Sequence, residues 1–310
     1  MDEQFEHRAL IASDSLRALL QRSDWPSTLR LGVHLAMFVL LFAGVIAAHD
    51  LPLQAAILAV ALAWVWSGLF APFHECTHRT AFRTPRANVV AAWVTGALFM
   101  MAPAVYRTFH FEHHRHTQDP DRDPELQGDP RYAAWPVGLR GWLRMASGWG
   151  LLQLKLRPLV GFACKPRSEW ERFARWSPCI VDAPGLVREC RILLAAWVAF
   201  VISALVFIPG GGWLLFAAWF THVFQTLWVA SEHTGLPLEG SILVRTRTVI
   251  SNPFVRFWLW NMNYHAEHHA WPGIPWYRLP AAHVYVTDHL GAVERGYTAL
   301  HRGVLTAKPS

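Results

Sequence analysis

The sequence predicts an all-α integral membrane protein with two transmembrane helical hairpins and a cytoplasmic helical cap. Three observations predict this class: 53% of the 310 residues are hydrophobic, only 16% are charged, and four apolar runs have the length of a membrane span. Soluble proteins carry roughly a quarter charged residues. We therefore expect a single domain over residues 1–310, with the lipid bilayer as its solvent.

The four apolar runs pair into two hairpins because their connections are short. Residues 31–48 and 53–73 are separated by four residues that include Asp50 and Pro52. Residues 192–208 and 213–230 are separated by Pro209 and three glycines. Such residues end helices and form turns. Each run approaches the ~20 residues that cross the hydrocarbon as a helix, so we expect four spans.

The distribution of basic residues predicts the orientation. No Lys or Arg occurs between Arg30 and Arg79 or between Arg191 and Arg245, so all 28 basic residues lie outside the hairpins. Under the positive-inside rule, both termini and the segments 106–190 and 231–310 are cytoplasmic. This arrangement accounts for the net charge of +6 without a nucleic-acid partner.

Three further stretches are expected to lie at or partly in the membrane. Residues 87–105 are apolar, but a full crossing would reverse the sides of all later segments, so a kinked, partly inserted or interfacial helix is expected. Leu139 to Leu159, which includes Lys155, reads as an amphipathic helix on the membrane surface. The Trp- and Pro-containing stretch from Trp271 to Leu279 predicts a second surface segment.

Eight of the 17 histidines fall in three short boxes beside the predicted spans. The first box is H-x-x-x-H and the other two are H-x-x-H-H, and their members are His74 and His78, then His110, His113 and His114, then His265, His268 and His269. Positions i, i+3 and i+4 share one face of a helix. Eight imidazoles exceed the four ligands of a structural zinc, so two metal ions are the natural interpretation. Imidazole suits zinc, copper, iron and nickel alike.

The first box, "HECTH", also fits the zinc-protease pattern H-E-x-x-H. In a zinc membrane peptidase, His74 and His78 would hold zinc and Glu75 would activate water. That alternative leaves both H-x-x-H-H boxes without a role, and the sequence has no Asp-Gly motif of the kind that intramembrane metalloproteases use. A metal transporter without catalysis is a further alternative, and it would need polar residues through several spans.

The order of the three boxes around two hairpins resembles the integral-membrane fatty acid desaturase and hydroxylase superfamily. The stretches "HECTHRTAF", "HFEHHRHTQDPDRDPEL", "SEHTGLP" and "WNMNYHAEHH" are similar to those of its bacterial members, over roughly residues 30–290. The resemblance implies a bacterial inner-membrane protein. It also implies a non-haem di-iron centre, held by histidines, that uses O2 to attack an unactivated C–H bond.

The same resemblance implies a ninth ligand, His233 in "SEHTG". Some members have an asparagine four residues before this histidine, where this chain has Val229. We therefore expect that contact to be absent or replaced by Glu232.

Carboxylates near the boxes are candidate hydrogen-bond partners of the ligand histidines. Glu75, Glu112 and Glu267 each lie within a box, where they would fix the tautomer of a ligand, or else be solvated. Asp119, Asp121 and Asp123 follow the second box and would act similarly or only shape a loop.

Two polar residues, His222 and Gln225, fall inside the fourth predicted span, where polar groups are costly. They would line a substrate path or bond a neighbouring helix. His116 is expected to be a partner of a ligand or a surface residue. The remaining histidines have no expected metal role: His7, His34, His49, His283, His289 and His301.

The expected chemistry needs two electrons per turnover, but the chain has no iron-sulfur cysteine pattern, haem-attachment motif or dinucleotide fingerprint. A separate ferredoxin- or rubredoxin-like donor with its reductase is therefore expected, and an arginine-rich cytoplasmic surface would suit an acidic one. The leading expectation is a desaturase of fatty acyl chains. The near alternative is a di-iron hydroxylase or monooxygenase acting on another apolar or small molecule.

Overall fold

The computed structural model describes residues 7–306, which form α-helices, short 3-10 helices and one small sheet. The α-helices are α1 (Ser13–Leu19), α2 (Trp25–Ala47), α3 (Pro52–Gly68), α4 (Phe70–His78), α5 (Pro85–Leu98), α6 (Pro103–His116), α7 (Pro124–Gly128), α8 (Gly138–Ala146), α9 (Trp149–Cys164), α10 (Ala183–Val206), α11 (Gly211–His233), α12 (Ile242–Arg245), α13 (Pro253–Trp258), α14 (His265–Ala270), α15 (Leu279–Val286) and α16 (Tyr297–Thr306). The 3-10 helices are η2 (Pro130–Ala133), η3 (Arg167–Arg172), η4 (Ser177–Cys179), η5 (Trp276–Arg278) and η6 (Thr287–His289). Strands β1 (Arg247–Val249) and β2 (Ala292–Glu294) pair in parallel.

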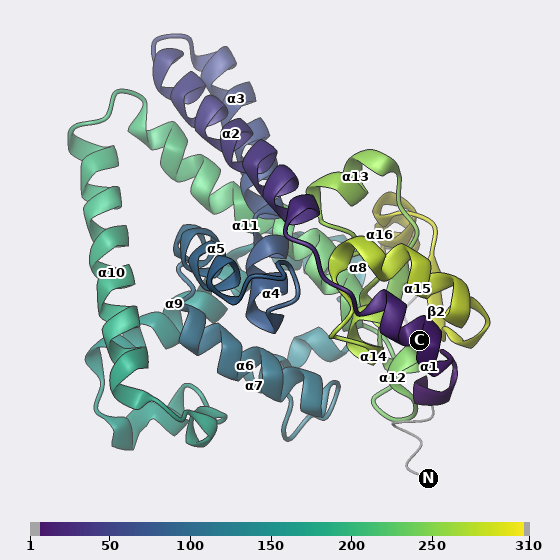
Figure 1. Ribbon diagram of the computed structural model, residues 1–310. Helices are drawn as coiled ribbons and strands as arrows, with labels where there is room; N and C mark the ends of the chain where they lie inside the picture. The colour runs from purple at the N-terminus through teal and green to yellow at the C-terminus, as the bar shows by residue number, and fades with distance from the viewer. Residues whose placement is uncertain (1–6, 307–310) are drawn as a thin grey trace.

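Four helical segments of the described chain are long and apolar enough to cross a membrane: α2, α3 together with α4, α10 and α11. They confirm the predicted class and the four spans, and Figure 1 shows both hairpin turns at one end of the molecule. The helices extend beyond the predicted apolar runs because helical turns also contain polar residues. α10 begins at Ala183, where the Asp182 side chain accepts a hydrogen bond from the Gly185 backbone N–H. The second and fourth spans continue to His78 and His233, so helical geometry positions both histidines.

One helix of each hairpin is mostly exposed and the other is mostly buried. In the most apolar 18 residues of each span, only 11% of the residues of α2 and 17% of those of α10 are buried inside the protein. The corresponding shares are 67% for α3 with α4 and 50% for α11. The exposed side chains include Val39, Leu40, Ile202 and Leu205. Apolar surface of this extent is stable against lipid tails and unfavourable in water. The chain is therefore a multi-pass membrane protein with α3 and α11 at its centre.

The apolar stretch at residues 87–105 is divided between two helices. α5 and α6 meet at an angle of 96°, and Met100 in the connection has a φ of 58°. Fourteen residues of α-helix extend about 21 Å, which is less than the ~30 Å of hydrocarbon. α5 by itself therefore does not cross the bilayer, and its partial insertion stays a prediction.

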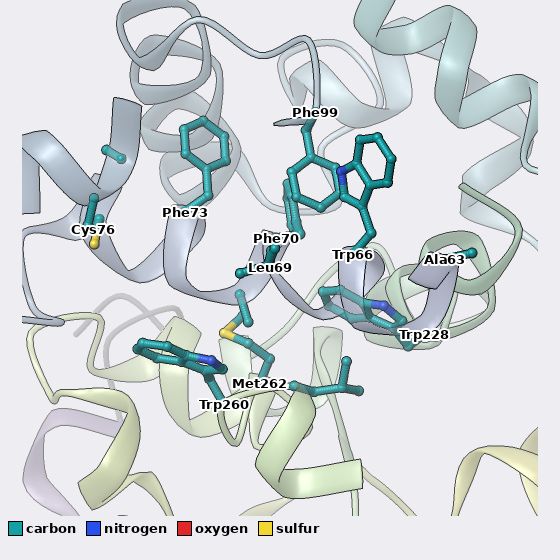
Figure 2. Packing of buried hydrophobic residues seen from close by; sticks show 14 of the residues in the cluster. Ala63, Trp66, Leu69, Phe70, Phe73, Cys76, Phe99, Trp228, Trp260 and Met262 are labelled. Atoms are coloured by element: carbon teal, nitrogen blue, oxygen red, sulfur yellow. The ribbon is translucent and has the colours of Figure 1, made fainter. Parts of the chain in front are cut away.

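The main hydrophobic core surrounds α3 and α4. Phe73 and Trp260 are fully buried in it, and Phe70 packs edge to face on Phe99 with ring centroids 5.7 Å apart. Figure 2 shows these aromatic side chains together with Trp228 of α11. Because the core contains residues from the spans and from the C-terminal segment, it holds α4 and the C-terminal helices in fixed relative positions.

Two predicted surface segments differ from the structure, the first only in part, since Leu139 and Leu143 of its first half are exposed. Residues 139–159 form two helices, α8 and α9, which are separated at Gly148, and Lys155 of α9 is only 4% exposed. The stretch from Trp271 to Leu279 is also buried, since Trp276 and Leu279 both lie in hydrophobic cores. Both errors have one cause: an amphipathic pattern predicts an apolar environment for one face, but lipid and protein satisfy it equally well.

We expect Gly148→Ala to destabilise the protein more than Gly138→Ala. Both glycines have a left-handed φ near 70°, which disfavours alanine by about 1–2 kcal/mol. A Cβ at position 148 would also lie 2.5 Å from the His222 backbone carbon, whereas one at position 138 meets nothing within 4 Å. The resulting overlap adds about 1–3 kcal/mol. Thermal unfolding in detergent measures the difference, and equal melting temperatures for the two variants would contradict the packing of Gly148 against α11.

Candidate metal centre

The first histidine box lies on α4, which continues the second span. His74 and His78 are one helical turn apart, with ring centroids separated by 5.1 Å. The helix ends at Arg79, whose left-handed φ of 60° interrupts it. The Arg107 guanidinium donates a hydrogen bond to the Thr77 carbonyl, which joins the end of α4 to α6. The first box is therefore positioned against the second.

The histidines of the second and third boxes lie on α6 and α14, and each box divides between two groups. The first histidine group contains His74, His78, His110, His114 and His268, and the second histidine group contains His113, His233, His265 and His269. In each box the residues i and i+4 stay together and residue i+3 joins the other group. All nine predicted ligands thus belong to one group or the other, and within each group one ligand atom per residue lies within 4.8 Å of all the others. Each group has the composition and spacing to hold a metal ion.

The nitrogen separations fit bound metal ions. Nε2 of His110 lies 2.7 Å from Nε2 of His78 and 3.0 Å from Nε2 of His114, and Nε2 of His269 lies 3.1 Å from Nε2 of His265. Two nitrogens that bind one ion at about 2.1 Å and at right angles are about 3 Å apart. Nε2 of His74 and of His233 are buried without a hydrogen-bond partner. Since buried polar nitrogens are normally paired, a metal ion is the partner that this arrangement fits.

The two groups are neighbours. The rings of His114 and His269, one from each group, are stacked with centroids 4.0 Å apart. Burial lowers the pKa of His268 to about 3, so this imidazole is neutral at physiological pH. Neutral imidazole is the form that binds metals. The two groups could therefore hold two metal ions side by side.

Several ligands are oriented through the ring nitrogen that faces away from the group. Nδ1 of His113 lies 2.9 Å from Oδ1 of Asp123, and Nδ1 of His233 donates to the Arg245 carbonyl at 3.2 Å. Nδ1 of His269 lies 3.2 Å from the Thr117 hydroxyl. A hydrogen bond at Nδ1 fixes the tautomer that leaves Nε2 free for a metal.

Among the predicted carboxylates, the structure places Glu75 beside two ligands. Its Oε1 lies 3.5 Å from Nδ1 of His74 and 3.6 Å from Nδ1 of His268, and the side chain is fully buried. The Thr80 hydroxyl and the Trp276 backbone N–H donate to its other oxygen. Glu75 therefore faces the outer nitrogens of two histidines in the first group.

The carboxylate beside the second box is Asp123, whereas Asp119 follows the second expectation and only shapes the loop. Asp119 accepts hydrogen bonds from the Asp121 and Arg122 backbone N–H groups and pairs with the Arg122 guanidinium. It shapes the loop and touches no ligand. Asp123 accepts from the backbone N–H groups of Gln118 and Glu125 and from His113. The loop turns back after Asp119, so the third aspartate reaches the histidine.

Two other predicted partners contact different residues. Glu112 pairs with Arg115, and its Oε2 lies 3.8 Å from Nε2 of His116. His116 was expected to be either a partner of a ligand or a surface residue. Glu267 accepts a hydrogen bond from Thr248 and pairs with His283, which was given no role. Among residues 7–306, neither carboxylate forms a hydrogen bond or ion pair with any of the nine histidines, so the expected contacts of Glu112 and Glu267 with ligands are wrong.

Glu232 lies on the metal side of the second group. Its Oε2 is 3.4 Å from Nε2 of His265, on the nitrogen that faces the other ligands. Val229, one turn earlier on α11, forms part of an adjoining cavity wall. Glu232 therefore lies close to the position at which some family members have an asparagine and this chain has Val229.

A cavity of about 90 Å³ adjoins both groups. Histidines of each group contribute to its wall, together with apolar side chains, and these residues include His74, His110, His113, His233, His265, Phe70, Met101, Val105, Leu159 and Val229. Of the two polar residues predicted inside the fourth span, Gln225 lines the cavity. His222 bonds the Ala218 carbonyl through Nδ1.

Sequence reasoning missed several polar residues of this cavity, among them Glu125, Tyr132 and Lys155. Glu125 lies 3.9 Å from Nδ1 of His113. None of the three belongs to a histidine box, and Lys155 carried the signal of a surface helix. Their role depends on how α7, η2 and α9 pack, and no spacing in the sequence encodes that packing.

The fold and the site together define a multi-pass membrane protein with two adjacent histidine groups, each able to hold a metal ion, beside an apolar cavity. The sequence model of the fatty acid desaturase family matches residues 51–301, and the chain belongs to this family. Membership confirms the resemblance seen in the three histidine boxes.

The curated relatives that match this chain are carotenoid ketolases. A zeaxanthin 4-ketolase of Chlamydomonas reinhardtii is 25% identical over 224 residues, which cover 71% of this chain and 42% of the relative. The β-carotene 4-ketolase 3 of Haematococcus lacustris is 23% identical over 237 residues, which cover 74% of this chain and 62% of the relative. The chain thus spans less than two thirds of the length of these relatives.

Proposed function

We propose that the protein is a membrane oxygenase that holds two iron ions at its histidine groups and uses O2 to insert oxygen at a C–H bond of an apolar substrate. The observation that carries the proposal is the cavity, because histidines of both groups and apolar side chains share its wall. Histidine nitrogens suit iron, and iron bound there would supply the oxidising power that an unactivated C–H bond requires.

The residues around the cavity would position the substrate and exclude water from it. Phe70, Val105 and Leu159 would hold the hydrocarbon part of a substrate beside the histidines. Glu232 and Glu125 line the same cavity, and each lies within 4 Å of a histidine of the second group, where they would hold or release protons. Hydroxylation consumes one O2, two electrons and two protons and yields an alcohol and one water. A second round on the same carbon consumes another O2, two electrons and two protons and yields one water and a geminal diol, which loses one water to become a ketone.

The relatives favour insertion of oxygen, since their names describe ketolases of carotenoids. A fatty acyl desaturase is the second candidate, favoured by the description of the family. Desaturation consumes the same O2, electrons and protons, but it yields an alkene and two waters. The two reactions therefore differ in the fate of the oxygen atoms.

The location and the electron donor are also part of the proposal. No Lys or Arg occurs between Arg30 and Arg79 or between Arg191 and Arg245, which supports a bacterial inner-membrane protein with both termini in the cytoplasm. Of the 28 basic residues, 25 are arginines, which would suit an acidic ferredoxin- or rubredoxin-like donor. Exchanging that donor for one with a neutral surface should slow electron transfer most at low ionic strength.

Labelling with ¹⁸O2 tests the reaction. The protein would be expressed with a donor and its reductase in bacterial cells that make fatty acids and, in a parallel strain, β-carotene and zeaxanthin. We expect a product that carries ¹⁸O and is absent from cells with His268→Ala. Mass spectrometry of the extracted lipids and pigments detects it.

The competing result is equally clear. An unlabelled alkene that forms with the wild type and not with His268→Ala would contradict the oxygenase proposal and support the desaturase. A soluble peptide product with one zinc per chain would support the peptidase instead.

A further inference from the structure

Lys155 places a buried amine in the wall of the cavity. It lies on α9, its side chain is only 4% exposed, and among residues 7–306 no carboxylate forms an ion pair with it. Burial holds the pKa of its ammonium well below the usual value. Lysine is rarely fully buried without a partner, because the desolvated charge is costly. An amine in this position therefore needs a specific reason.

The neighbours of Lys155 satisfy only part of its hydrogen-bonding capacity. Nζ donates to Oε1 of Gln225 at 2.5 Å, and it lies 4.7 Å from the Phe99 ring centroid and 5.7 Å from that of Phe70. Nε2 of Gln225 is buried and has no hydrogen-bond partner. Lys155 and Gln225 thus offer N–H donors with no acceptor in the described chain beyond the one carbonyl oxygen.

The donors lie one aromatic ring away from the histidines. Phe70 contacts Lys155 on one side, and its ring centroid is 6.4 Å from that of His74 on the other. Phe70, Lys155, Gln225 and His74 all line the same cavity. A molecule in the cavity would therefore meet apolar walls, a metal-ligand histidine and a pair of N–H donors.

A pure hydrocarbon would leave these donors unpaired. Each buried donor without an acceptor costs about 1–3 kcal/mol, whereas an oxygen atom placed between them would accept from both. Sites that hydrogen-bond a substrate oxygen discriminate strongly against the analogue that lacks it. The pair is thus suited to select a substrate by one polar atom.

We propose that Lys155 and Gln225 bind an oxygen atom of the substrate, so that the substrate is an apolar molecule with a hydroxyl, carbonyl or carboxylate group. This inference rests on the proposed function, since it takes the cavity as the substrate site. The oxygen would fix which carbon lies beside the histidines. Lys155 is then a specificity-determining residue, and the three oxygen groups differ only in charge and geometry.

Ligand-induced stabilisation tests the proposal without turnover. Metal-loaded protein in phospholipid nanodiscs would be titrated with two probe sets that differ in oxygen: zeaxanthin against β-carotene, and dodecanoate and 1-dodecanol against dodecane. The shift in unfolding temperature with probe concentration reports the apparent dissociation constant. We expect an oxygenated probe to bind at least about tenfold more tightly than its hydrocarbon in at least one set. Comparing dodecanoate with 1-dodecanol shows whether the oxygen is charged.

A double variant, Lys155→Met with Gln225→Leu, removes the donors together and leaves no half-paired group. Its preference for oxygenated probes should fall below about twofold, while its metal content stays that of the wild type. Lys165→Met, which changes an exposed lysine just after the same helix, is the matched control and should keep the preference.

The proposal is overturned if neither set shows a preference in the wild type, or if the preference survives in the double variant. Failure of the ¹⁸O2 experiment with the binding preference intact would instead reject the oxygenase and leave the oxygen-binding site standing.

Discussion

His268→Ala is expected to lower the metal content from about two ions per chain to about one and to reduce turnover by at least about 100-fold. His268 is the only residue of the third box in the first histidine group, and its Nε2 lies 3.2 Å from that of His78. Its loss removes one of five ligands and the link between α14 and α4. Even residues that only orient ligands typically cost 10–100-fold in metal affinity or activity. Elemental analysis of the purified protein, beside product formation, measures both effects.

His289→Ala is the matched control, since it removes an exposed histidine outside both groups. It should retain two ions and full activity. Circular dichroism would establish that both variants keep their helices. If His268→Ala retained two ions per chain and wild-type turnover, the first histidine group would not be a metal site.

Asp123→Asn is expected to weaken metal binding by about 10–100-fold. Asp123 is 2% exposed and accepts from Nδ1 of His113, so the amide would remove the charge that orients this ligand. Buried carboxylate–histidine pairs fix the ring tautomer, and an amide can present either its oxygen or its nitrogen. Competition with a chelator, followed by metal release, measures the affinity.

Asp119→Asn provides a control within the same loop. Asp119 pairs with Arg122 near the surface and contacts no ligand, so the variant should lose less than about twofold in affinity. A larger loss for Asp119→Asn than for Asp123→Asn would mean that the loop takes a different path around the second box.

The spans were predictable from sequence because hydropathy and turn residues act locally. The four apolar runs and the two short turns determine the hairpins, and no distant contact is needed to identify them. The helix ends were not predictable. α10 begins nine residues before the apolar run, since its first turns carry Arg188, Glu189 and Arg191 at the helix base.

The candidate site was predictable in its members and not in its arrangement. Helical spacing brings residues i, i+3 and i+4 to one face, and this predicted eight box histidines near a common centre. The division of each H-x-x-H-H box between the two groups depends on the relative rotation of α4, α6 and α14. Likewise, Asp123 and not Asp119 reaches His113 because of the path of a loop.

The sequence by itself determined the membrane class, the two hairpins and the eight box histidines, because lipid solubility and helical periodicity depend on neighbouring residues. The ninth candidate ligand, His233, came from the resemblance to the family. Only the tertiary structure decided which histidines share a metal site, which carboxylates orient them and that Lys155 is buried beside Gln225. The physical reason is that these contacts join helices far apart in the chain, such as α9 and α11. Their approach is set by the shape and packing of whole helices, which no local pattern encodes.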